Sequence, residues 1–132
     1  MGQISTIRLI GNRGRIEVEG VGVYSDLNCT TPVTYLDWGN LEPASTKNQT
    51  IFVRNEGNRP TSLFLATTDW NPANLSQYMH LTWNYKSQTI YTYETIQVTL
   101  TLTTSSSTEF DNYVTSNKIG YFDFSIVIGI NQ

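Results

Sequence analysis

The feature that most constrains the fold is a strict two-residue alternation of apolar and polar side chains along Thr95–Thr103. Isoleucine, valine or leucine occupies every even position, and threonine or glutamine occupies every odd position. A β-strand places alternate side chains on opposite faces of a sheet, so this run predicts a strand with one buried and one hydrated face. The chain must therefore contain at least one sheet with one buried face and one solvent-exposed face.

Further strands are predicted on both sides of this run. Leu41–Pro60 reads as a turn, a β-rich segment at Gln49–Arg54, and a second turn. The last run, Gly120–Ile130, carries the heaviest apolar face, which favours a central place in a sheet, paired near the Thr95 strand. Shorter alternations at 81–86 and 63–65 predict two more half-buried strands.

The first part of the chain contains a change of parity. In Gly14–Tyr24 the apolar residues share one parity before Gly20 and the other after it, which predicts a strand that changes face or sheet at this glycine. Before it, Ile4–Ile10 forms a β-like run, and Gly11–Gly14 is expected to be a hairpin turn.

Helical signals are confined to one place. Asn71 as N-cap, followed by Pro72 at the first helical position, predicts a short helical turn near 71–76. Some seven to nine short strands with almost no helix favour an all-β, two-sheet antiparallel sandwich formed by a single domain, residues 1–132. An up-and-down barrel is the alternative, because strand patterning does not distinguish closure from stacking.

Composition excludes several classes of function. Only 14% of the residues are charged and the net charge is −3 without a basic cluster, so no nucleic-acid partner is expected. Cys29 is the only cysteine, which excludes an intrachain disulfide and a cysteine-based zinc site. The sequence lacks both a long apolar run and the features of a signal peptide. Either the protein is cytosolic, or the chain begins after a removed signal or membrane anchor, and the family resemblance given below favours the second alternative.

Four segments together carry a resemblance to a known family. They are Val21–Val33, Leu36–Pro43 with its Leu-Glu-Pro ending, Val53–Asn58 with its Val-Arg-Asn-Glu-Gly-Asn pattern, and Thr68–Asn74. The chain resembles small archaeal cell-surface modules and, more distantly, biofilm fibre proteins of the TasA and camelysin type. The resemblance implies an immunoglobulin-like sandwich at the cell exterior. The family usually has glycine after Leu-Glu-Pro, where this chain has Ala44.

No catalytic residue and no cofactor is predicted. His80 is the sole histidine; Asp69 and Ser76 lie near it in sequence, but no nucleophile-elbow pattern accompanies them. One histidine and one cysteine also make a poor transition-metal site. A calcium site built from oxygen ligands is an alternative, with Glu109, Asp111 and Asn112 as candidates and with Asp69 and Asn71 as a second group.

Aromatic residues suggest a second alternative, a carbohydrate-stacking platform, because their faces suit the C–H surfaces of sugars. Trp83 shares the parity of Leu81 and is expected in the core, whereas Tyr91 and Tyr93 are expected to be exposed. The other members of the group are Trp38, Trp70, Tyr78 and Tyr85. Asn28, Asn48 and Asn74 begin acceptor sequons for N-glycosylation, although a chain this rich in Asn, Ser and Thr produces such triplets by chance.

The sequence thus predicts a non-enzymatic, extracellular surface module with a structural or adhesive role. Its partner would be a protein, or another copy engaged through an edge strand, and surface glycans are a further candidate. In the alternative filament hypothesis, residues 4–10 complete the sheet of the next copy, with Ile4, Ile7, Leu9 and Ile10 as the exchanged side chains. Contact with a membrane would require an anchor that these residues do not contain.

Overall fold

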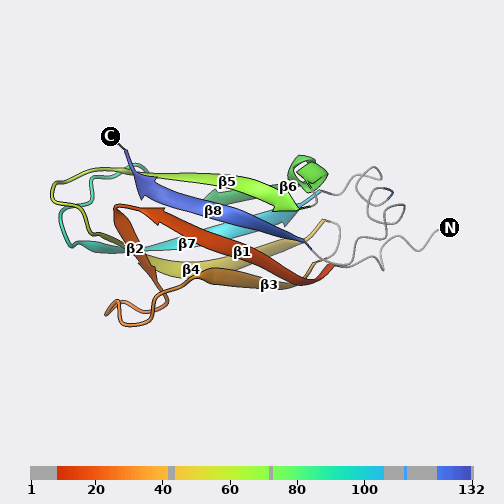
Figure 1. The fold of residues 1–132 in the computed structure, drawn as a ribbon, viewed down its shortest axis with the longest axis horizontal. Helices are drawn as coiled ribbons and strands as arrows, with labels where there is room; N and C mark the ends of the chain where they lie inside the picture. The colour runs from red at the N-terminus through yellow and green to blue at the C-terminus, as the bar shows by residue number, and fades with distance from the viewer. Residues whose placement is uncertain (1–8, 42–43, 72, 106–111, 113–121, 132) are drawn as a thin grey trace.

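The computed structural model describes residues 9–41, 44–71, 73–105, 112 and 122–131, which form two packed four-stranded sheets (Figure 1). One sheet has the strand order β3-β1-β8-β5, and the other has the order β2-β4-β7-β6. The predicted all-β, two-sheet sandwich is therefore confirmed. The elements are β1 (Leu9–Glu19), β2 (Val21–Tyr24), β3 (Tyr35–Leu41), β4 (Thr46–Asn55), β5 (Leu63–Asn71), the 3-10 helix η2 (Ala73–Gln77), β6 (Met79–Trp83), β7 (Thr95–Thr104) and β8 (Asp123–Ile130).

The alternating run that predicts the fold is β7. It lies between β4 and β6 and pairs antiparallel with both. Val98, Leu100 and Leu102 are buried, while the threonines between them are more exposed. The hydrated face of this sheet is accordingly rich in hydroxyl groups.

The chain crosses from one sheet to the other at Gly20, as predicted. β1 ends at Glu19 in the first sheet, and β2 begins at Val21 in the second. Gly20 has a φ of +76°, a conformation that side-chain-bearing residues rarely adopt. The parity change in the sequence therefore marks a change of sheet.

The last strand is central, as predicted, but its predicted neighbour is wrong. β8 pairs with β1 and β5, whereas the Thr95 strand, β7, lies in the opposite sheet. The pairing of β1 with β8 is parallel, with Arg13 opposite Asp123 and Glu19 opposite Gly129 at its two ends. Apolar periodicity identifies a buried face but not which of two facing sheets a strand joins, and this explains the error.

Two local predictions also need correction. Gly11–Gly14 is not a hairpin turn, because β1 runs through it with register shifts against β3 around Asn12. The helical turn is present as η2, but Asn71 is the last residue of β5 and not the helix N-cap. Leu75 of η2 is fully buried, so this helix helps to cover the core.

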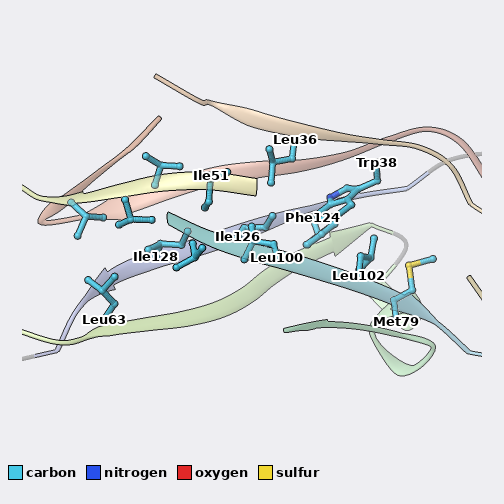
Figure 2. Close-up of a cluster of buried hydrophobic side chains, with 14 of the residues drawn as sticks. Leu36, Trp38, Ile51, Leu63, Met79, Leu100, Leu102, Phe124, Ile126 and Ile128 are labelled. Atoms are coloured by element: carbon cyan, nitrogen blue, oxygen red, sulfur yellow. The ribbon is translucent and has the colours of Figure 1, made fainter. Parts of the chain in front are cut away.

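The core lies between the two sheets (Figure 2). Ile51 and Val53 of β4 are buried in it, and each apolar side chain of this size contributes about 1.5 to 3 kcal/mol when buried. Trp70 stacks on Phe124 at 4.2 Å between ring centroids. The sheet facing β4 contributes the fully or almost fully buried side chains Trp38, Phe124, Ile126 and Ile128.

Candidate binding surfaces

A corner pocket of about 270 Å³ lies where β1 passes into β2. Apolar side chains line most of it, and Gly22, Tyr24, Thr34 and Glu56 complete the lining. Val18 belongs to this lining and is 46% exposed. The apolar members are Ile16, Val18, Val21, Val23, Pro32 and Val33.

Beside this pocket, the pairing of β1 with β3 comes to an end. The pairing of β1 with β3 ends at Arg15 and Tyr35, followed by one bond from the Ile16 N–H to the Thr34 carbonyl at 2.8 Å. Alternate residues of a strand point their N–H and C=O groups to the same side, so those of Val18 face the same side as those of Ile16. Among the described residues, no hydrogen bond joins Val18 to a neighbour there.

A compact polar cluster borders the pocket on the outer face of β2 and β4. The Arg54 guanidinium donates to Glu56 Oε2 through Nε at 3.1 Å and through Nη2 at 2.8 Å, and it lies 5.2 Å from the centre of the Tyr24 ring. The Tyr24 hydroxyl donates a short hydrogen bond to the same Glu56 oxygen. Gly22 makes room for the cluster, because a Cβ there would clash with that oxygen.

Electrostatics within the cluster follow from these bonds. The hydrogen bond from Tyr24, then those from Arg54, hold the pKa of the Glu56 carboxyl below its ordinary value. The same bond to Glu56, with burial second, raises the pKa of the Tyr24 phenol. Glu56 is therefore a carboxylate at neutral pH, and the cluster fixes the wall of the corner pocket.

A second hollow, of about 340 Å³, lies on the outer face of the other sheet. Arg15 of β1, Tyr35 of β3 and Asp123 of β8 line it, together with Ile16 and Thr34. Arg15 Nη2 donates to Ser125 Oγ at 3.0 Å, and Ser125 Oγ donates to Asp69 Oδ2 at 3.3 Å. Neither this set of residues nor the corner pocket was predicted from the sequence.

His80, Ser76 and Asp69, which lie near one another in sequence, do not form a site in the structure. His80 is exposed on β6, opposite Thr103 of β7. Ser76 is exposed in η2, and Asp69 bonds to Ser125. Within the described ranges, no hydrogen bond or ion pair joins His80 to either residue. The prediction that the chain is not an enzyme remains a prediction.

The calcium candidates fall mostly outside the part of the chain that the structure describes. This applies to Glu109 and Asp111, whereas Asn112 is described and exposed. Over the described residues, no three His, Cys, Asp or Glu side chains come together to hold a metal ion. A calorimetric titration with Ca²⁺ would test the remaining possibility, and heat of binding would support it.

The aromatic candidates do not share one surface. Trp38 is 2% exposed and belongs to the core, and Trp70 packs against it. Trp83 and Tyr85, 5.1 Å apart between ring centroids, are half-buried at the edge of the core. Tyr91 and Tyr93 are 60% and 69% exposed, as predicted, on the loop that follows β6.

The glycosylation candidates are all exposed but differ in setting. Asn28 lies in the loop between β2 and β3, and Asn74 lies in η2. Asn48 lies within β4, where its Oδ1 accepts a hydrogen bond from Thr101 at 2.8 Å. Loop position makes Asn28 the more accessible acceptor.

Two of the four strand-exchange candidates lie outside the described residues, and the other two lie in β1. Ile4 and Ile7 lie outside the described residues. Leu9 and Ile10 belong to β1, and Leu9 pairs with Leu41 of β3. Any exchanged segment is therefore restricted to residues before Leu9.

Comparison with known proteins adds no assignment, since neither a protein-family model nor a curated protein matches the chain. The resemblance to archaeal surface modules stays a prediction. No helix in the described ranges has the length and apolar character needed to span a bilayer.

Proposed function

We propose that the chain is a non-enzymatic interaction module of a cell surface, which binds an extended segment of a protein partner along the open edge of β1. The observation that carries the proposal is Val18, an exposed apolar side chain at the rim of the corner pocket, on a backbone stretch that has no neighbouring strand on one side. Adding a strand to such an edge supplies main-chain hydrogen bonds and a pocket for a side chain.

The pocket restricts the chemistry of this partner. Its apolar lining suits one aliphatic or small aromatic side chain, whose burial contributes about 1.5 to 3 kcal/mol. Exposed Glu19, which follows Val18, places a negative charge next to it, whereas the charge of Glu56 in the wall is already paired with Arg54. A segment that carries a basic residue beside its apolar anchor is therefore favoured.

A peptide-display selection on the folded protein tests this proposal. We expect enriched peptides to combine an apolar anchor with a basic residue, and to slow amide exchange at Val18. Val18→Lys should weaken their binding by about tenfold or more, because the charge blocks the pocket. Leu27→Lys is the matched control, since Leu27 is 63% exposed and lies outside the pocket. Peptides that bind both variants as tightly as the wild type would exclude this edge.

The cell-surface setting rests on the resemblance described above. Intact-mass analysis of native material tests it. Added hexose mass that disappears with Asn28→Gln would support an exterior location, and an unmodified mass would count against the glycosylated form.

The filament hypothesis is a second candidate, in which the partner segment is the first part of another copy. It is favoured by the apolar residues Ile4 and Ile7, which directly precede β1 in the chain. Deletion of residues 1–8 leaves β1 intact, whereas a longer deletion would remove residues that pair with β3. Loss of concentration-dependent association in sedimentation velocity would support strand exchange, and an unchanged distribution of species would exclude it.

A further inference from the structure

The hollow between Arg15, Tyr35 and Asp123 has the properties of a small polar binding site. Its volume of about 340 Å³ lies at the lower end of the range of ligand pockets, which suits a single ring-sized molecule. Three different strands, β1, β3 and β8, contribute Arg15, Tyr35 and Asp123, and Thr34 lies directly before β3. Because these strands are neighbours in one sheet, the backbone ladder fixes the spacing of the three groups.

We propose that this hollow binds one ring of a neutral saccharide. The proposal is independent of partner binding at the β1 edge.

The position of the guanidinium supports a built site. Arg15 Nη2 donates to Ser125 Oγ at 3.0 Å, and Ser125 is fully buried although it lies on the outer face of β8. Ser125 Oγ donates in turn to Asp69 Oδ2 at 3.3 Å, and Asp69 has a φ of +57°, a region that non-glycine residues seldom occupy. This chain of bonds orients Arg15 before a ligand arrives, which reduces the entropy lost on binding.

The charges around the hollow favour a neutral ligand. Among the described residues, Arg15 and Asp123 line the same space but form no ion pair with each other. A bound anion would be repelled by the Asp123 carboxylate, and a bound cation would be repelled by the Arg15 guanidinium. Sugar hydroxyls instead accept from the guanidinium and donate to the carboxylate, and such charge-assisted hydrogen bonds are stronger than neutral ones.

The third wall supplies an apolar face. Tyr35 lies directly opposite Arg15 in the β1–β3 ladder and is 45% exposed. An aromatic ring with an apolar body and a polar tip can pack against the C–H surface of a pyranose while its neighbours bind the hydroxyls. Arg15 and Asp123 are thus assigned to hydroxyl recognition, Tyr35 to stacking, and Ser125 to positioning of Arg15.

Amide chemical shifts during titration test the site. The probes are the methyl glycosides of glucose, mannose, galactose and N-acetylglucosamine, each added to about 50 mM, because one ring bound in a shallow site has a dissociation constant on the order of 1 mM. We expect at least one glycoside to shift the amides of Arg15, Tyr35 and Asp123. The absence of localised shifts with all four probes, or shifts centred on Tyr91 and Tyr93, would overturn the proposal.

Substitutions identify the role of each residue. Arg15→Met and Tyr35→Ala should each weaken binding about tenfold or more. The matched controls are Arg59→Met and Tyr91→Ala, which replace exposed residues outside the hollow and should leave the affinity unchanged.

Ser125→Ala distinguishes positioning from folding, since it should weaken binding in a protein whose β8 amides retain their exchange protection. Equal affinity of Ser125→Ala and wild type would overturn the positioning role. Displacement of the glycoside by sodium acetate or glycine would identify an ion site and would refute a neutral saccharide.

Discussion

Asn55, the last residue of β4, is predicted to be the largest single polar contribution to stability in this fold. Its side chain is fully buried and makes three hydrogen bonds. Nδ2 donates to the carbonyls of Arg59 at 3.0 Å and Ile90 at 2.9 Å, and Oδ1 accepts from the Gly57 N–H at 2.9 Å. It thereby ties the turn after β4 to the loop before β7.

The cost of removing this side chain follows from those bonds. Each buried hydrogen bond contributes about 1 kcal/mol net, and a buried backbone group left without a partner costs about 1 to 3 kcal/mol. Asn55→Ala should therefore lower the free energy of unfolding by about 3 to 5 kcal/mol. For a domain of this size the melting temperature should fall by about 10 to 20 °C. Urea unfolding followed by circular dichroism measures the first quantity, and a thermal melt measures the second.

Asn55→Asp gives a sharper test, because the introduced carboxylate faces two carbonyl oxygens in a buried site. Burial and repulsion raise its pKa in the folded state above the unfolded value of about 3.9. A raised folded pKa means that stability is highest at low pH and falls as the pH rises above about 4, by up to about 1.4 kcal/mol per pH unit. Unfolding in urea across a pH series should show this slope.

The control for both variants is Asn58, which is exposed in the same turn. Asn58→Ala and Asn58→Asp should change the free energy of unfolding by less than about 0.5 kcal/mol. A loss below about 1 kcal/mol for Asn55→Ala would refute the reasoning. So would an Asn55→Asp variant whose stability deficit is the same at every pH.

Three further predictions follow from the backbone and from the polar cluster. Ala44→Gly should raise the free energy of unfolding by about 1 kcal/mol, because Ala44 has a φ of +59°; an unchanged or lower melting temperature would contradict this. Gly20→Ala should lower it by about 1 to 3 kcal/mol, since φ is +76° and the added Cβ would lie 2.9 Å from Ile130 Cδ1; a neutral effect in urea unfolding would exclude strain at the sheet crossing. Tyr24→Phe should raise the pKa of Glu56 toward its ordinary value, as its strongest hydrogen bond is lost. The depressed pKa contributes stability that is present at neutral pH and is lost as the pH falls from the unfolded pKa through the folded pKa, so this loss should be smaller, and should end at a higher pH, in Tyr24→Phe. A titration of the Glu56 carboxyl by NMR that matches the wild type would contradict the assigned cause.

Local periodicity predicted where the strands lie in the sequence, but it did not predict which strands pair with one another. The β7 alternation and the parity change at Gly20 are consequences of side chains pointing to alternate faces, so both can be read from neighbouring residues. The parallel ladder between β1 and β8 joins residues more than a hundred positions apart. No short-range signal specifies that contact, and the hollow formed by Arg15, Tyr35 and Asp123 depends on it.

Asn55 is a different case, because a signal for it was present. It shares the parity of Ile51 and Val53, but the sequence placed the end of the strand at Arg54 and Asn55 in the turn; β4 extends to Asn55, and this parity puts the side chain on the buried face. A buried amide must be hydrogen-bonded, which predicts a structural role for the residue. The corner pocket had no comparable signal, since its exposed Val18 fits the apolar pattern of an ordinary core residue.

The parallel ladder between β1 and β8 has a mechanical consequence. β1 begins and β8 ends at opposite ends of the sandwich (Figure 1). A tension applied at Leu9 and Asn131 therefore pulls the two strands past each other and loads the seven register pairs together, in shear. By contrast, a hairpin that is pulled apart from its open end loses its inter-strand hydrogen bonds one at a time. Forced unfolding is governed by the unfolding rate, and this geometry suits a domain that transmits load along its long axis.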